Sequence, residues 1–266
     1  MAFLECKFAS AQLGKACCMN IILPQNNIPD GGLPVVYLLH GLSDDYTAWC
    51  RYTSIERYAN ACNCAVVMPD GGRSFYTDAV NGGRYWSFIS EELPEIVTRL
   101  FPISTVPEKT FAAGLSMGGY GALKLALLRP EKFAAAAALS PVVNLQTRFF
   151  AEDTKSWQPE LLNIFGSFDK EKFDETRHTP FNIALNAVFH KRKLPRLLSI
   201  CGTDDFMIAD NRRFNADMLS IADARPTLLE FHSFEYPGSH NWEFWDTHIR
   251  DVMAFFFENR LPEHKL

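Results

Sequence analysis

The stretch Lys109–Leu123, with the sequence KTFAAGLSMGGYGAL, constrains the fold of this chain more than any other. Its strand-forming residues stop at Gly114, Ser116 follows, and a helix-forming run begins soon afterwards. A serine between Gly114 and Gly118 on a sharp strand-to-helix turn is typical of a nucleophile elbow. The turn strains the serine backbone, and a Cβ at either glycine would collide with the neighbouring strand or helix. The stretch therefore predicts a serine nucleophile at the end of a strand.

Strands and helices alternate along the rest of the chain. Strands are predicted at 34–39, 65–68, 110–113, 133–139, 196–201 and 227–236, with those at 34–39, 65–68 and 196–201 buried. Helices are predicted at 53–61, 86–101, 122–128, 210–222 and 243–258. Residues 2–9 and 13–23 are expected to form an antiparallel edge, and Pro94 lies where it can kink a helix. This alternation predicts an α/β fold with a doubly wound, mostly parallel sheet.

No linker or repeat divides residues 1–266, so we expect a single domain. Residues 141–195 carry no clear period, which predicts an insertion of short helices that caps the site.

Composition excludes several classes of protein. A formal net charge of −5 argues against nucleic acid or an anionic membrane surface as partner. The longest apolar runs are too short to span a bilayer, and residues 1–10 lack the pattern of a secretory signal. Seven cysteines, without paired metal-finger spacing, do not form a disulfide framework. A reduced, cytoplasmic protein is the expectation.

Ligands bind beyond the carboxyl ends of the strands in such sheets, and three chemically complementary residues follow strands there. Ser116 is the predicted nucleophile, His240 the base that takes its proton, and Asp205 the carboxylate that orients the imidazole. Their order, serine then acid then histidine, is that of an α/β-hydrolase. The amides of Met117 and Leu42 are the predicted donors to the oxyanion.

Several alternatives stay open at this point. Asp204, next to Asp205, is the alternative acid. His40 can be read as a base, but a ring that stabilises the loop after its strand fits better. Trp49, Tyr76 and Trp86 are candidates for the acyl or alcohol pocket, although aromatic residues are more often core.

Five motifs carry a resemblance to a known family. They are LLHGLSDDYTAW (38–49), EELPEIV (91–97), TFAAGLSMGGYGALKLAL (110–127), CGTDDF (201–206) and GSHNWEFW (238–245). Together they resemble the esterase D family of α/β-hydrolases, and most closely its tributyrin-esterase-like bacterial carboxylesterases. The resemblance implies a Ser-His-Asp enzyme that acts on short-chain acyl esters, from acetyl to butyryl or hexanoyl, without metal or cofactor. Together with the many aromatic residues, it leaves a homo-oligomer open.

The same family holds S-formylglutathione hydrolases and feruloyl esterases, which are the alternative functions. Formylglutathione hydrolases carry a cysteine in the oxyanion loop, where this chain has Gly41-Leu42-Ser43-Asp44. This difference argues against glutathione thioesters as substrates. Acetylated or feruloylated sugars are further candidate substrates. A binding protein without activity is disfavoured, because no member of the triad is missing.

Overall fold

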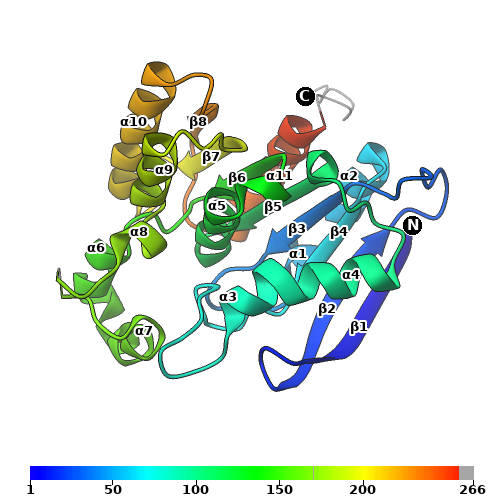
Figure 1. Ribbon diagram of the computed structural model, residues 1–266, viewed down its shortest axis with the longest axis horizontal. Coiled ribbons are helices and arrows are strands. Elements are labelled where there is room, and N and C mark those ends of the chain that lie inside the picture. The colour runs from blue at the N-terminus through cyan, green and yellow to red at the C-terminus, as the bar shows by residue number, and fades with distance from the viewer. Residues whose placement is uncertain (170, 258–266) are drawn as a thin grey trace.

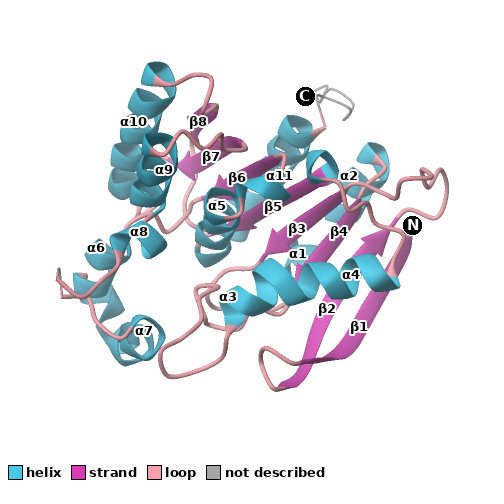
Figure 2. Cartoon of the chain, viewed as in Figure 1, coloured by secondary structure: helices cyan, strands magenta, loops and turns pink. Residues whose placement is uncertain are grey.

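The computed structural model describes residues 1–169 and 171–257. Within them, eight strands form one sheet in the order β1-β2-β4-β3-β5-β6-β7-β8 (Figures 1 and 2). The strands are β1 (Ala2–Ser10), β2 (Lys15–Leu23), β3 (Val35–Leu39), β4 (Ala65–Pro69), β5 (Thr110–Leu115), β6 (Ala135–Leu139), β7 (Arg196–Gly202) and β8 (Phe231–Tyr236). β2 pairs antiparallel with β1 and β4, and all other neighbours are parallel. This is the α/β-hydrolase fold that the sequence predicts.

Helices cover both faces of the sheet, as Figure 1 shows. They are α1 (Ala48–Tyr52), α2 (Ile55–Cys62), α3 (Tyr85–Ser87), α4 (Leu93–Leu100), α5 (Met117–Leu128), α6 (Leu145–Phe150), α7 (Gln158–Phe165), α8 (Glu175–His178), α9 (Pro180–Phe189), α10 (Ile208–Ala224) and α11 (Trp242–Phe256). Side chains along each strand alternate between two cores. One core includes side chains of α4, α5, α9 and α10, and the other includes those of α1, α2 and α11. The predicted last helical residue, 258, lies outside the described residues.

The alanine run in β6 is a strand because the sheet requires one there. Ala135–Leu139 pair in register with β5 on one side and β7 on the other. α5 and α11 pack against the two faces of β6, where small side chains allow a close approach. Tertiary packing thus overrides the helical preference of alanine.

Pro94 does not kink a continuous helix. Instead, the predicted helix is divided into α3, a π-helical turn over Phe88–Glu92, and α4, with Pro94 in the first turn of α4. Proline has no N–H for the carbonyl of Ser90, four residues earlier. Lys132 Nζ donates to that carbonyl at 2.9 Å, so the missing helical bond is replaced.

Residues 141–195 contain α6, α7, α8 and α9 and a 3₁₀ segment at Glu152–Trp157. α9 packs against α5 and α10, while α6 and α7 lie at one edge of the molecule (Figure 1). The helical content agrees with the prediction, and the role of this segment as a cap stays a prediction. Among the described residues, no helix combines the length and apolar character needed to cross a membrane.

Candidate active site

Ser116 lies on the turn between β5 and α5 in a strained conformation. Its φ is +52° and its ψ is −116°, in a region that residues with a side chain rarely adopt. Its amide donates to the carbonyl of Leu139 at 2.9 Å, and its carbonyl accepts from Tyr120 at 3.0 Å. These bonds hold the turn, so the hydroxyl stands at the carboxyl end of the central strands.

The flanking glycines are required by close backbone approach. A Cβ on Gly118 would lie 2.3 Å from the carbonyl oxygen of Leu39, and one on Gly114 would lie 2.4 Å from the backbone of Gly118. Because both neighbours are main-chain atoms, no side chain can move away to make room. This is the steric reason that the sequence motif implies.

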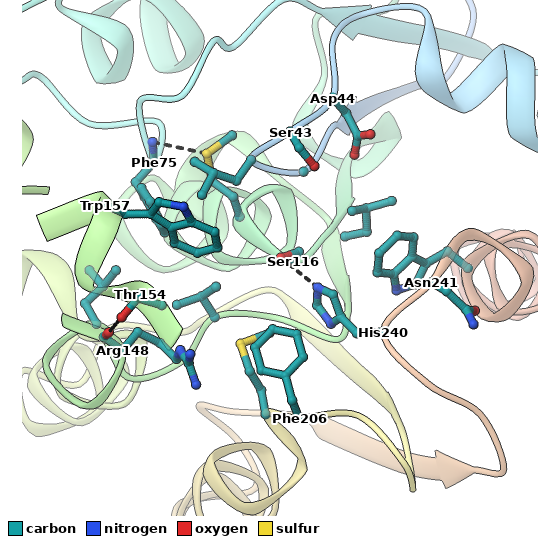
Figure 3. Close-up of a pocket in the computed structure, with 18 of the residues that line it drawn as sticks. Ser43, Asp44, Phe75, Ser116, Arg148, Thr154, Trp157, Phe206, His240 and Asn241 are labelled. Atoms are coloured by element: carbon teal, nitrogen blue, oxygen red, sulfur yellow. Dashed lines mark hydrogen bonds between the residues drawn. The ribbon is translucent and has the colours of Figure 1, made fainter. Parts of the chain in front are cut away.

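Ser116, His240 and Asp205 form a hydrogen-bonded chain. His240 Nε2 lies 3.1 Å from Ser116 Oγ, and His240 Nδ1 lies 2.7 Å from Asp205 Oδ2. Figure 3 shows the imidazole of His240 directed at Ser116. The geometry suits proton transfer from the hydroxyl to Nε2. The structure thus brings together the three residues that the sequence singles out.

Asp205 is buried and fully engaged. Its side chain has no exposed surface, and its Oδ1 accepts from the amide of Met207 at 2.8 Å. Burial favours the neutral carboxyl, but the hydrogen bonds from His240 and Met207 outweigh it and lower the pKa of Asp205. Asp204, the alternative acid, is exposed. A buried carboxylate therefore faces His240 Nδ1.

Two aromatic rings fix the orientation of the imidazole. Phe206 lies 4.7 Å from His240 between ring centroids, and Trp245 lies 4.9 Å away at an interplanar angle of 90°. Trp245 is held in turn by a 3.3 Å hydrogen bond from its Nε1 to Ser140 Oγ. The ring of His240 therefore has little freedom to turn away from Ser116.

The amides of Met117 and Leu42, the predicted oxyanion donors, both belong to residues that line the cavity at Ser116. Met117 is the first residue of α5, where N–H groups have no partner within the helix. Neither amide donates a hydrogen bond to another residue in the described part of the chain. Both amides therefore stay predicted donors to a developing negative charge.

His40 holds the peptide that contains the Leu42 amide. Its Nε2 accepts from the amide of Gly71 at 2.8 Å, so the neutral ring carries its proton on Nδ1, which donates to the carbonyl of Gly41 at 2.7 Å. Burial lowers the pKa of His40 and keeps the ring neutral. The Gly41 carbonyl and the Leu42 amide share one trans peptide and point in opposite directions. His40 therefore supports this loop, which agrees with the structural role predicted from the sequence.

A largely apolar cavity of about 430 Å³ opens at Ser116 (Figure 3). Its lining comes from the sheet side and from the 141–195 segment: Gly41, Leu42, Ser43, Asp44, Phe75, Leu115, Ser116, Met117, Val142, Leu145, Arg148, Thr154, Trp157, Leu161, Phe206, Met207, His240, Asn241, Trp242 and Trp245. In the described residues, no group of three or more His, Cys, Asp or Glu side chains is placed to hold a metal ion.

In the part of the chain that the structure describes, the lining of this cavity does not include the three aromatic residues predicted to bind substrate. Trp49 is buried and donates to the carbonyl of Leu39 at 3.0 Å. Tyr76 is buried and its hydroxyl donates to the carbonyl of His40 at 2.9 Å. The ring of Trp86 packs against Lys124 Nζ at 5.2 Å. Each ring instead packs against a loop or a helix behind the site, and a role of these residues in substrate binding stays a prediction.

Other aromatic residues form the wall instead. Phe206 follows Asp205 directly, and Trp242 and Trp245 follow His240 at the start of α11, so adjacency to the predicted triad was an available signal. Trp157 comes from the 141–195 segment, where no periodicity marked it. Residues from that segment reach the site only through tertiary folding.

Comparison with known proteins gives a consistent result over nearly the whole chain. The model of the family described as "Putative esterase" matches residues 10–256. The acetyl esterase of Caldicellulosiruptor saccharolyticus is 30% identical, over 96% of this chain and 98% of its own length.

Solved structures agree. FphF, a fluorophosphonate-binding serine hydrolase of Staphylococcus aureus in a substrate-bound structure, is similar with a TM-score of 0.83 and 32% identity, covering 96% of this chain and 98% of its own. FrmB, the S-formylglutathione hydrolase of Staphylococcus aureus, is similar with a TM-score of 0.80 and 31% identity, with the same coverage.

Proposed function

Because the chain belongs to the putative esterase family, we propose that it is a serine carboxylesterase for short-chain acyl esters, from acetyl to butyryl or hexanoyl. The observation that carries this proposal is the hydrogen-bonded chain from Ser116 through His240 to buried Asp205, at the mouth of an apolar cavity. The acetyl esterase relative supports the choice of a small acyl group.

In the proposed reaction, His240 Nε2 takes the proton of Ser116 Oγ as that oxygen attacks the ester carbonyl carbon. The carbonyl oxygen becomes an oxyanion that the amides of Met117 and Leu42 stabilise. The bond to the alcohol oxygen then breaks, and His240 donates its proton to the departing alcohol. Water, deprotonated by His240, then attacks the acyl-enzyme. As the bond from Ser116 Oγ to the acyl carbon breaks, His240 returns the proton to Oγ, which releases the carboxylic acid and free Ser116. Asp205 stabilises the protonated imidazole in both halves.

The second candidate is a thioesterase of the S-formylglutathione hydrolase type. The similarity to FrmB favours it, whereas the stretch Gly41-Leu42-Ser43-Asp44, which has no cysteine after Gly-Leu-Ser, disfavours it. A feruloyl esterase has weaker support, since the ferulic acid esterase structure is only 21% identical and shares the fold alone. Acetylated sugars remain candidate alcohol components of the natural substrate.

A hydrolysis assay tests the proposal. We expect p-nitrophenyl acetate and butyrate to be hydrolysed well, decanoate poorly, and S-formylglutathione and methyl ferulate slowly. Ser116→Ala is expected to lower kcat by a factor on the order of 10⁴ or more, because the nucleophile is lost. A preference for S-formylglutathione would favour the second candidate. Full activity in the Ser116→Ala protein would refute the mechanism.

A further inference from the structure

Arg73 connects two parts of the molecule that meet at the cavity. Its Nε and Nη2 donate to the two carboxylate oxygens of Glu160, both at 2.7 Å, and Glu160 belongs to α7. Its Nη1 donates to the carbonyl of Leu42 at 3.3 Å. The guanidinium also lies 5.9 Å from the ring centroid of Trp157, which lines the cavity. One side chain thus contacts both the loop at residues 40–44, here called the oxyanion loop, and α7.

The other end of α7 is attached independently. The amides of Val80 and Asn81 donate to the carbonyls of Ile164 and Asn163 at 3.0 and 2.8 Å. These backbone bonds fix the C-terminal end of the helix to the loop that follows β4. At the N-terminal end, Gln158 Nε2 donates to the carbonyl of Phe149 at 2.8 Å within the same segment. Loss of the Arg73–Glu160 pair would therefore uncouple that end from Arg73 without detaching the helix.

The contact with Leu42 bears on the proposed oxyanion donor. His40 fixes the peptide that joins Gly41 to Leu42, through the Gly41 carbonyl. Arg73 fixes the next peptide, through the Leu42 carbonyl. With both peptides held, the backbone angles of Leu42 are set from either side, and so is the direction of its N–H.

We propose that Arg73 is a positioning residue that holds the oxyanion loop in its productive geometry and couples it to α7 through Glu160. The inference rests on the proposed esterase function, since it assigns the Leu42 amide to the oxyanion. Arginine suits this role because its planar fork donates to a carboxylate through two nitrogens while a third donor remains for the carbonyl. A lysine ammonium at this position lacks that fixed fork.

A contribution to overall stability is not the expected role. The side chains of Arg73 and Glu160 are 42% and 33% exposed, and ion pairs of such exposure add little to folding stability. The position of the Leu42 amide should matter more for the rate, because a small displacement of a catalytic donor has a large effect on rate. The substitutions below should therefore change kcat more than the melting temperature.

The test compares Arg73→Gln, Arg73→Lys and Glu160→Gln with a matched control, Arg212→Gln. Arg212 pairs with Glu235 at 2.8 Å on the surface between α10 and β8, and neither residue lines the cavity. We expect Arg73→Gln to lower kcat about tenfold for every p-nitrophenyl ester, less than the roughly 10²-fold cost of removing a whole oxyanion donor. Arg73→Lys should recover little of the lost kcat, and Glu160→Gln should lower kcat less than Arg73→Gln does. The double variant with both Arg73→Gln and Glu160→Gln should have a kcat no lower than that of Arg73→Gln. Arg212→Gln should stay within twofold of wild type.

Hydrogen exchange measured by mass spectrometry provides a readout that does not depend on activity. In Arg73→Gln, peptides covering residues 38–46 and 154–162 should exchange faster, and in Arg212→Gln they should not. Unchanged exchange in both peptides would overturn the inference. So would an unchanged kcat, or a loss confined to KM that varies with acyl length, in an active protein. A wild-type protein without activity on any ester would instead contradict the proposed function, and exchange would still test the coupling. If Arg73→Gln folds poorly, Glu160→Gln supplies the same comparison.

Discussion

Asp204 and Asp205 are neighbours in sequence with opposite surroundings. Asp205 is 2% exposed and bonded to His240, whereas Asp204 is exposed and its amide donates to Gly238. Only the buried carboxylate can hold the Nδ1–H tautomer of His240 and stabilise its charged form.

Asp205→Asn should therefore lower kcat for p-nitrophenyl butyrate by a factor on the order of 10⁴, because an amide misplaces the imidazole tautomer. Asp204→Asn is the matched control and should remain within a few-fold of wild type. Steady-state kinetics of both proteins decide the matter. The reverse pattern would assign the acid role to Asp204.

Lys124 is a charged residue whose side chain is buried. It is 3% exposed on α5, and its Nζ donates to Thr77 Oγ1 at 2.6 Å. Burial, together with the positive charge of Arg177, lowers the pKa of Lys124 to about 7. The bond to Thr77 supports the loop that carries Phe75 and Tyr76, two residues with positive φ. The lysine thus stabilises a strained loop at an electrostatic cost.

That cost predicts a dependence of stability on pH. Between about pH 7 and pH 10, the folded protein binds fewer protons at Lys124 than the unfolded chain does, so this residue makes the free energy of unfolding rise with pH. Urea unfolding at pH 7, 8, 9 and 10 should show a shallower rise in Lys124→Met than in wild type. Lys193→Met, at an exposed position, should follow wild type. Equal slopes in all three proteins would contradict the lowered pKa.

At the scale of elements, the contact between β3 and α5 determines where the nucleophile stands. Gly118 in α5 packs directly on the backbone at the end of β3, and Tyr120 and Ala122 continue the buried face of the helix. This close approach sets Ser116 beside the loop that carries Leu42. A larger residue at the contact would force the helix and the strand apart.

Gly118→Ala should consequently destabilise the protein by roughly 1–3 kcal/mol, the usual cost of overpacking, and should also lower kcat. Gly31→Ala is the control, because a Cβ there would meet only the end of the Lys109 side chain at 3.6 Å. Chemical denaturation and p-nitrophenyl butyrate hydrolysis measure the two effects. Equal stability of the two variants would show that the backbone contact is not tight.

At the scale of the whole molecule, the cavity is shared between the sheet and the 141–195 segment. Ser116 and His240 come from the ends of strands, while Leu145, Trp157 and Leu161 come from that segment. Figure 3 places Arg148, Thr154 and Trp157 of this segment on the side of the cavity away from His240. Substitutions in the 141–195 segment should therefore change substrate preference without loss of the catalytic geometry.

Trp157→Ala should enlarge the cavity and raise the ratio of kcat/KM for octanoyl over butyryl esters about tenfold, the scale on which apolar pockets discriminate chain length. Trp86→Ala, which removes an aromatic outside the cavity, should leave that ratio unchanged even if stability falls. Assays over a series of p-nitrophenyl esters measure the ratio. A shift of this ratio in Trp86→Ala alone would assign Trp86 to the substrate site.

Self-association of the protein remains a prediction, which light scattering can check.

The sequence by itself determined the parts of this protein that depend on local sterics and on chain order. Gly114-x-Ser116-x-Gly118 specified a strained turn, because no side chain fits at either glycine. Apolar runs that alternate with helical segments specified the sheet, and strand ends identified Ser116, Asp205 and His240 as candidates. In a parallel sheet the carboxyl ends meet at one edge, so residues far apart in the chain can be placed together without coordinates.

Only the tertiary structure decided which aromatic residues surround the site and what supports the oxyanion loop. Trp49, Tyr76 and Trp86 resemble pocket residues in sequence, yet their rings are directed into packing and hydrogen bonds behind the loops. Trp157 lines the site from a segment without periodicity. The Arg73–Glu160 pair joins two residues that are 87 positions apart in the chain. Such contacts depend on how layers pack rather than on local propensity, and no pattern in the sequence encodes them.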